Sequence, residues 1–464
     1  MSNSPPAFSS ELTASVAVTR FGLGARPGEL GKVKADPQGW LLAQIRREGA
    51  DLPVGLDGAP FKSTPERFAE FRAYREAIKA AGADEDARKA ARQPYNTIVA
   101  DEMLGRVRLG CLTEAGFRER WSLFWLNHFT VSAVKGEEEA ALVSAFDREA
   151  IRPNVFRRFE ELLLASSRHP GMLIYLDQQQ SAGPNSLAGL RRNMGLNENL
   201  AREILELHTV GADAGYTQGD VTEFARALTG WSIGRKDAPG ESEGRFMFRP
   251  QLHEPGRRRV FGNSYSDSGE EQARNVLAEL ANHPKTARRI AFKLAAHFVA
   301  DTPPPSLVDR LEKRFRDTHG DLAELARTLV TSPEAWPPEA AKFKTPDEFL
   351  VSAYRAAGQA PILAPREVVQ PLTQLGQRPY SAPQPNGWPD VAVAWAAPGA
   401  MIKRLEWADA FASAYAPQSA FPDAVALEAL GPRLRPNTLA AIHRAESRKE
   451  GFTVLLMSPE FQRR

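Results

Sequence analysis

Helical periodicity constrains the fold of this chain more than any other feature of its sequence. Apolar residues recur at three- and four-residue spacing along most of its length, for example in residues 117–129, 197–210 and 286–299. That spacing places apolar side chains on one face of a helix, whereas the strict alternation that is typical of a half-buried strand is scarce. The sequence therefore predicts a mainly α protein, built as a large multi-helix domain.

Two segments depart from this pattern. Residues 61–92 are rich in charge and alanine, which predicts a charged helical excursion from the body of the protein or a mobile arm. Residues 244–265 contain the clearest strand signal, two β-prone runs separated by His253-Glu254-Pro255-Gly256, and predict a small β-hairpin insertion. We expect residues 1–14 to be a flexible N-terminus and residues 15–464 to form a single domain.

Composition excludes several classes of protein. The 59 Lys and Arg residues nearly balance the 57 Asp and Glu residues, whereas a nucleic-acid-binding protein needs clustered basic residues in excess. The single cysteine, Cys111, rules out an intrachain disulfide and metal centres built from several thiolates. No apolar run approaches the roughly 20 residues that span a bilayer, and the N-terminal residues lack the pattern of a secretory signal. We therefore expect no nucleic-acid or membrane partner and a cytoplasmic location, with the periplasm as the alternative.

Three of the eight histidines lie on apolar faces of predicted helices. His128 belongs to an aromatic stripe, and His208 and His297 stand beside leucine and isoleucine residues on their own helices. A single inward-facing histidine is usually a core residue whose ring nitrogens bond to main chain or to a carboxylate. Three such residues, together with His253-Glu254, raise the expectation that some of them converge on an interior site.

Glu203 is the carboxylate that best fits such a site, because it borders the apolar face that carries His208. A partly buried carboxylate needs a cation, a metal, a proton or compensating hydrogen bonds. Imidazole and carboxylate ligands together suit Zn, Fe or Mn, and helical bundles build such sites from inward-pointing side chains. We therefore predict a divalent metal site made by His128, Glu203, His208 and His253.

The same region also predicts acid–base chemistry. Histidine has an unperturbed pKa near neutrality, so His208 and Glu203 are candidate catalytic residues. Arg202 or Arg226 would then orient an anionic group of the substrate. The competing interpretation of Arg202 is an ordinary surface ion ladder with the glutamates four residues before and after it.

Several motifs together resemble one bacterial family. They are Arg20-Phe21-Gly22-Leu23-Gly24, Phe124-Trp125-Leu126-Asn127-His128-Phe129, the run from Asn197 to Gly211, Gly215-Tyr216-Thr217-Gln218, Ala225-Arg226-Ala227-Leu228-Thr229-Gly230-Trp231, His253-Glu254-Pro255-Gly256 and Pro385-Asn386-Gly387-Trp388-Pro389. From about residue 15 to the C-terminus the chain resembles the family called domain of unknown function 1800. The resemblance implies a bacterial, mainly helical protein, and it implies no particular activity.

A second resemblance concerns a shorter stretch. Trp121 and His128, followed later by His208-Thr209, look like the distal-site sequence of animal-type haem peroxidases. That resemblance implies a haem cofactor, with His128, His253 or His297 as the iron ligand, and we assign His297 to cofactor binding. The chain has no Cys-x-x-Cys-His sequence for covalent haem attachment.

Two functional hypotheses from different classes follow. The first is a metal-dependent or haem-dependent enzyme with an interior His/Glu site, either a hydrolase or an oxidoreductase, that acts on a small molecule. The second is a non-catalytic binding or assembly factor that contacts a partner protein through residues 61–92. A bound metal that is lost when His208 or Glu203 is changed to alanine would favour the first hypothesis.

Overall fold

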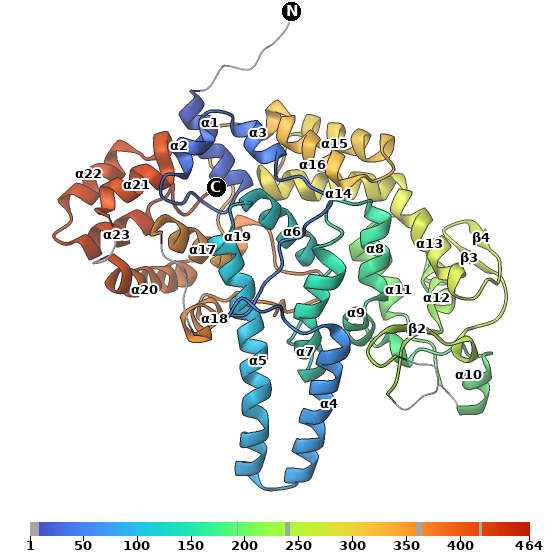
Figure 1. The fold of residues 1–464 in the computed structure, drawn as a ribbon. Helices are drawn as coiled ribbons and strands as arrows, with labels where there is room; N and C mark the ends of the chain where they lie inside the picture. The colour runs from blue at the N-terminus through green and yellow to red at the C-terminus, as the bar shows by residue number, and fades with distance from the viewer. Residues whose placement is uncertain (1–8, 193, 237–241, 359–363, 417–419) are drawn as a thin grey trace, which may run out of the picture.

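The computed structural model describes residues 9–192, 194–236, 242–358, 364–416 and 420–464. These residues form a mainly α-helical protein with two small antiparallel sheets, as the periodicity predicts (Figure 1). The α-helices are α1 (Ser10–Val16), α2 (Glu29–Val33), α3 (Pro37–Leu42), α4 (Thr64–Ala81), α5 (Glu85–Leu112), α6 (Gly116–His128), α7 (Glu137–Phe146), α8 (Phe159–Arg168), α9 (Pro170–Tyr175), α10 (Leu187–Arg192), α11 (Asn199–Glu203), α12 (Gln218–Leu228), α13 (Glu270–Asn282), α14 (Pro284–Phe298), α15 (Pro305–Asp317), α16 (Leu322–Thr331), α17 (Pro346–Ala356), α18 (Val369–Gln374), α19 (Ala392–Trp395), α20 (Pro398–Tyr415), α21 (Pro422–Leu430), α22 (Pro436–Arg444) and α23 (Arg448–Met457).

Local sequence signals explain where the helices that matter for the site begin. Helix α17 starts with a capping box, in which Thr345 and Glu348 each accept a hydrogen bond from the other's backbone N–H. Helix α14 starts at Pro284, and the ring of His283 accepts a hydrogen bond from the backbone N–H of Lys285. Both helices therefore begin at fixed points, which sets the direction of the side chains that follow.

Short π-helical turns directly follow α1, α7 and α11. They span Ala17–Phe21, Asp147–Ile151 and Ile204–His208. Such turns are rare and occur mainly at functional sites. The third one ends at His208, one of the residues singled out by the sequence.

The β structure differs in its pairing from the predicted hairpin. The two antiparallel pairs are β1 (Trp231–Ile233) with β2 (Phe246–Phe248), and β3 (Arg258–Val260) with β4 (Asn263–Tyr265). A small β-hairpin is confirmed by β3 and β4, which are joined by Phe261-Gly262 with positive φ at both residues. The predicted pairing across residues 253–256 is wrong, because β2 takes its partner from β1, which lies earlier in the chain.

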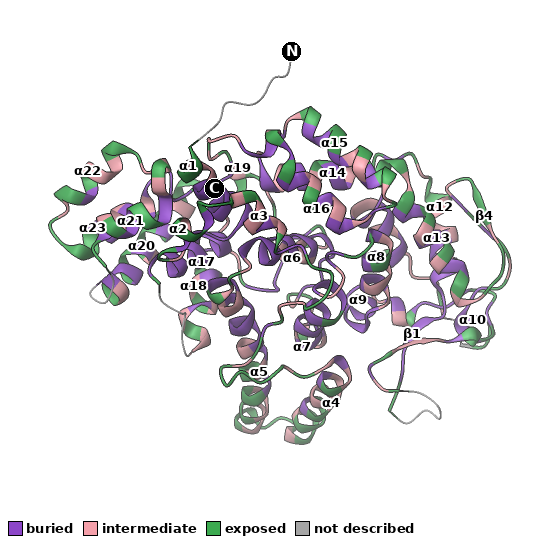
Figure 2. Cartoon of the chain, turned by 45° about the horizontal axis from the view of Figure 1, so that its top comes forward, coloured by how far each residue is buried: buried purple, intermediate pink, exposed green. Residues whose placement is uncertain are grey.

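Helices α4 and α5 form an arm that projects from the body (Figure 1). The arm includes the segment predicted to leave the body, residues 61–92, and the turn at its tip contains Gly82 with φ of 56°. At its base, Tyr74 and Tyr95 stack with ring centroids 4.5 Å apart, and the Tyr74 hydroxyl donates to Glu137 of α7 at 2.6 Å. The base is therefore held on the body, whereas the tip is exposed (Figure 2).

The core consists of two large clusters of buried apolar side chains. The first takes nearly all its members from residues 14–336 and includes Trp121 and Trp125 of α6, which lies in the buried centre of the molecule (Figure 2). The second takes most of its members from residues 349–461, together with residues of α5 such as Val107. That residues 15–464 form a single domain stays a prediction.

Charged groups are also buried, and they are paired. Arg152 is 2% exposed and contacts both oxygens of Glu119, at 2.6 and 2.9 Å, and Asp147 at 3.0 Å. Removing one member of such a group leaves an uncompensated charge in the interior. The three residues therefore hold α6 firmly against the π-helical turn that follows α7.

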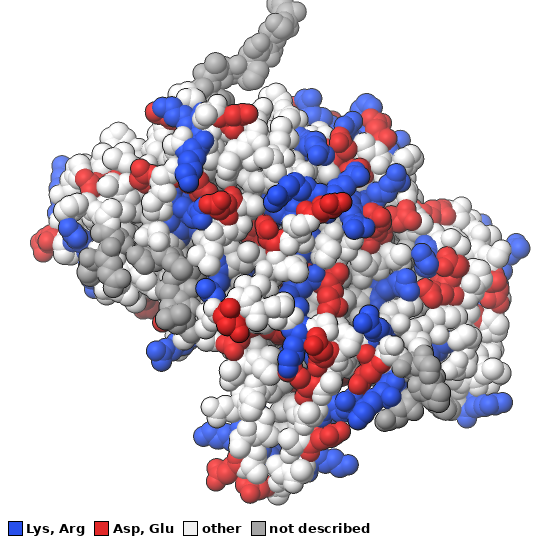
Figure 3. All heavy atoms as spheres, in the orientation of Figure 1, with Lys and Arg blue, Asp and Glu red and all other residues white. Residues whose placement is uncertain are grey.

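The ends and the surface carry three further findings. Residues 10–14, predicted to be flexible, belong to α1, and residues 1–8 lie outside the described residues. Within the part of the chain that the structure describes, no helix is both long and apolar enough to cross a bilayer. Basic and acidic side chains alternate over the face seen in Figure 3, in line with the near-zero net charge.

Candidate active site

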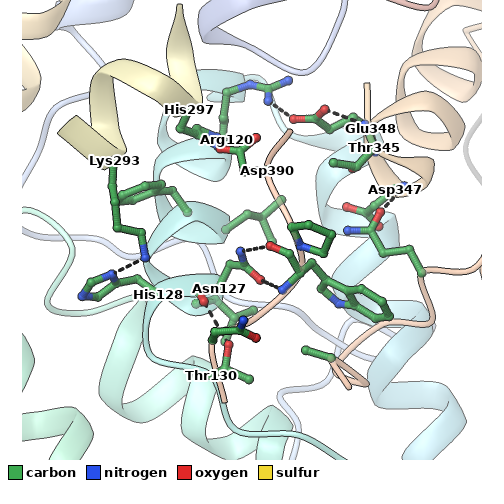
Figure 4. Close-up of a pocket in the computed structure, with 18 of the residues that line it drawn as sticks. Arg120, Asn127, His128, Thr130, Lys293, His297, Thr345, Asp347, Glu348 and Asp390 are labelled. Atoms are coloured by element: carbon green, nitrogen blue, oxygen red, sulfur yellow. Dashed lines mark hydrogen bonds and ion pairs between the residues drawn. The ribbon is translucent and has the colours of Figure 1, made fainter. Parts of the chain in front are cut away.

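A cavity of about 370 Å³ lies where the two core clusters meet. Side chains of α6 and α14 line one wall, and the N-terminal turn of α17 and residues 377–391 line the other (Figure 4). Cavities of this size that combine apolar walls with a few converging polar groups are the usual places for ligand binding. This cavity is therefore the candidate active site.

The wall formed by residues 377–391 is anchored by Asn127. Its amide donates to the Trp388 carbonyl at 2.9 Å, and its carbonyl oxygen accepts from the Trp388 N–H at 2.7 Å. The adjacent Gly387 has φ of 81°, and a Cβ there would lie 2.4 Å from the main-chain oxygen of Asn127. Glycine is therefore required for this wall to pack on the end of α6.

His297 and Asp390 form a hydrogen-bonded pair at the cavity. His297 Nδ1 lies 2.7 Å from Asp390 Oδ2, and because a carboxylate only accepts, Nδ1 carries the proton. Nε2 keeps a lone pair, is itself buried, and has no hydrogen-bond partner among the described residues. Burial lowers the pKa of His297 while Asp390 raises it, and the net shift is downward. The ring is therefore neutral at pH 7, which is the protonation state of a general base.

Cations keep Asp390 in its charged form. Lys342 Nζ lies 3.0 Å from Asp390 Oδ1 and also donates to the main-chain oxygen of Asp390 at 2.6 Å. Burial raises the pKa of Asp390, but His297, Lys342 and Arg464 outweigh it and hold that pKa well below its usual range. The carboxylate thus remains an acceptor that orients the His297 ring.

A second set of contacts leads from the cavity to His208. Lys293, one turn before His297 on α14, donates to His128 Nδ1 at 2.9 Å, and His128 Nε2 donates to the main-chain oxygen of His208 at 3.0 Å. Burial lowers the pKa of His128 well below its usual value and that of Lys293 to about 8. An amine with that pKa is about 90% protonated at pH 7. Lys293 is therefore a cation held by a neutral imidazole.

The structure brings the three predicted apolar-face histidines into one region. The ring centroids of His128 and His208 are 6.2 Å apart, and the Phe124 ring contacts both His128 and His297. His128 and His297 line the cavity, whereas His208 lies behind His128 on the ring of Phe129. Burial lowers the pKa of His208 to about 3, so its ring is neutral.

Glu203 and His253 lie in other surroundings. Glu203 is only partly buried, its pKa is raised by burial and by Glu206, and no contact to His208 is recorded among the described residues. His253 Nδ1 donates to the main-chain oxygen of Thr229 at 2.8 Å, and its ring packs on β2. Among the described residues, no group of three or more His, Cys, Asp or Glu side chains is placed to hold a metal ion. The four-ligand metal site stays a prediction that these contacts do not support.

The two predicted arginines make local ion pairs. Arg202 lies between Glu198, at 3.2 Å, and Glu206, at 3.5 Å, in the ladder that was its competing interpretation. Arg226 pairs with Glu223 in the first turn before it on α12. Neither arginine lines the cavity, so a role for them in orienting a substrate stays a prediction.

Lys293 and Asp390 are site residues that the sequence did not indicate. Lys293 stands four residues before His297, so the same helical spacing that predicted His297 as inward-facing also places Lys293 on that side. Asp390 directly follows the Pro385–Pro389 motif, but only the contact of that motif with Asn127 brings it to His297.

Comparison with known proteins yields one finding. A family model described as "Protein of unknown function (DUF1800)" matches residues 16–463. Neither the curated proteins nor the solved structures contain a match to the chain.

Proposed function

The chain belongs to the DUF1800 family, whose description names no function, and we propose from its own cavity that it is a hydrolase in which His297 acts as general base. The observation that carries the proposal is the His297–Asp390 pair, with an unpartnered Nε2, in the wall of a cavity that also presents a lysine cation. Asp390 is a positioning residue, because it acts through the imidazole.

The reaction needs only a water molecule and an ester. Water bonded to His297 Nε2 gives its proton to that nitrogen while its oxygen attacks the carbonyl carbon. The negative charge that develops on the carbonyl oxygen is stabilised by the Lys293 ammonium, which lies in a partly buried site where such charges interact strongly. The imidazolium then returns the proton to the leaving oxygen, so that an alcohol and a carboxylic acid are formed, and the acid loses its remaining proton to solvent and leaves as the carboxylate.

A small activated ester tests this chemistry without assuming the natural substrate. We expect wild-type protein to hydrolyse 4-nitrophenyl acetate and H297N to be slower by at least about 100-fold in kcat/KM, because general-base catalysis contributes about that much. H319N is the control, since His319 is exposed and its φ of 51° suits asparagine. No hydrolysis by the wild type, or equal hydrolysis by H297N, would overturn the proposal.

The pH profile separates the positioning role of Asp390 from a purely structural one. Asp390 raises the pKa of His297, so D390N should move the acidic limb of kcat/KM to lower pH, in addition to lowering the rate. A structural role alone would lower the rate and leave the limb where it is.

A second candidate is a non-catalytic assembly factor, favoured by the projecting arm with its exposed charged tip. Under this proposal a partner protein binds the arm, and shortening it by whole turns at Gly82 should abolish complex formation while leaving ester hydrolysis unchanged. For either function we propose a bacterial protein of the cytoplasm that uses neither nucleic acid nor a membrane as its partner.

A further inference from the structure

The acidic side chains around the cavity all have cation partners, whereas two of the basic side chains have no carboxylate partner in the part of the chain that the structure describes. Every carboxylate that lines it has a cation within ion-pair distance: Asp301 has Lys342, Asp347 has Arg106, Glu348 has Arg120 and Arg464, and Asp390 has Lys342. Two lining cations, Lys293 and Arg378, have no carboxylate within ion-pair distance among the described residues. Lys293 instead donates to the neutral ring of His128. Lys293 therefore carries a positive charge that no carboxylate of the described residues contacts, and Asp390 acts on it only from across the cavity.

The mouth of the cavity is apolar. Phe292 and Val391 line it and are 48% and 42% exposed. Deeper in, Leu123, Phe124 and Leu126 continue the apolar wall. Large exposed apolar side chains at the rim of a pocket usually mark a surface that a ligand covers.

These two features together define one kind of ligand, and the inference rests on the hydrolase proposed above. We propose that the substrates are esters of aliphatic acids, and that their aliphatic carboxylate product binds with its anionic group at Lys293 and its chain along Phe292 toward Val391. The position that stabilises the carbonyl oxygen during the reaction is then the position that holds the carboxylate afterwards. Arg378 at the cavity adds to the positive field without a direct contact being required.

Calorimetric titration at pH 7 with three simple aliphatic probes, octanoate, octan-1-ol and acetate, tests the inference. We expect octanoate to bind at least tenfold more tightly than octan-1-ol, which lacks the charge, and than acetate, which lacks the chain. K293M should weaken octanoate at least tenfold and leave octan-1-ol unchanged, whereas R444M, at an exposed site on α22, should change neither. Octan-1-ol binding as tightly as octanoate, or K293M binding octanoate like the wild type, would overturn the inference.

A measurement on the wild type covers the case in which K293M does not fold. Among the described residues, the charged or titratable groups that face Lys293 include Arg289 on its own helix and His128 on α6. His208, in the π-helical turn after α11, and Asp390, in the opposite wall, also face it. Because its pKa is about 8, Lys293 loses its proton between pH 7 and 9.5, so the affinity for octanoate should fall at least fivefold over that range. A constant affinity would count against Lys293 as the binding group.

The variant H297N separates this inference from the proposed function. It should bind octanoate like the wild type while failing to hydrolyse 4-nitrophenyl acetate. Octanoate binding without His297-dependent hydrolysis would overturn the hydrolase alone, whereas His297-dependent hydrolysis without octanoate binding would overturn the ligand class alone.

Discussion

Lowering the pH from 7 to 5 should destabilise the fold through His208. The ring is 1% exposed, packs on Phe129, and its Nδ1 has no hydrogen-bond partner among the described residues. Burial, together with the charges of Lys293 and Arg289, lowers the pKa of His208 to about 3. In the unfolded chain a histidine titrates near 6.5. Between these two values the unfolded chain takes up a proton that the folded chain excludes, so stability is present above pH 6.5 and is lost as the pH falls.

The size of the effect follows from proton linkage. At pH 7 the unfolded ring carries little charge, and at pH 5 it is almost fully protonated, whereas the folded ring stays neutral at both values. Integration over this range gives a loss of about 2 kcal/mol in the free energy of unfolding from this one ring. H208N removes the ring. Between pH 7 and pH 5, the free energy of unfolding of H208N should therefore decrease by about 2 kcal/mol less than the free energy of unfolding of the wild type decreases.

Urea unfolding at pH 7 and pH 5, followed by tryptophan fluorescence and by circular dichroism, measures this difference. Absolute stabilities do not enter, because each protein is compared only with itself at the two pH values. H319N serves as the control and should lose as much stability as the wild type, since the exposed ring of His319 is solvated in both states. If H208N and the wild type lose equal stability, burial of a neutral ring at this position is refuted.

Two further predictions concern packing. G387A should lower the free energy of unfolding by about 1–3 kcal/mol, because it combines a positive φ with a clash against the end of α6. The control is G399A, since a Cβ at Gly399 meets nothing within 4 Å. Equal urea midpoints for the two variants would contradict this account. R152M should cost about 3–5 kcal/mol, because it leaves two buried carboxylates without their cation. A variant as stable as the wild type in urea would contradict this expectation.

The helical body could be predicted because its information is local. Apolar spacing and capping residues lie within each segment, and the helix of residues 117–129 ends at His128, within one residue of the prediction. Strand pairing could not be predicted in the same way, because strands of three residues specify little register. The partner of β2 is β1, which lies earlier in the sequence and outside the segment predicted to form the hairpin.

The site was predictable only where a helix presents its residues by spacing alone. That rule placed His128, His208 and His297 on apolar faces of their helices, and the structure brings these three residues into one region. It did not indicate Asp390, which lies in a loop and contacts His297. That loop is held in place by Asn127, which precedes it by more than 250 residues in the sequence. It favoured Glu203 over Lys293, because a half-buried carboxylate is a stronger sequence signal than a lysine, a residue that most often lies in solvent.

Mid-way along the arm, Arg75 of α4 lies 3.8 Å from Glu137 of α7, whereas beyond residue 75 the outer turns form no ion pair with the body among the described residues. Turns can therefore be added or removed at the tip without breaking such a pair. Adding or removing matched turns on both helices changes how far the tip reaches by about 1.5 Å per residue, and the walls around His297 are not altered. The reach of the arm can therefore change while the walls of the cavity stay the same.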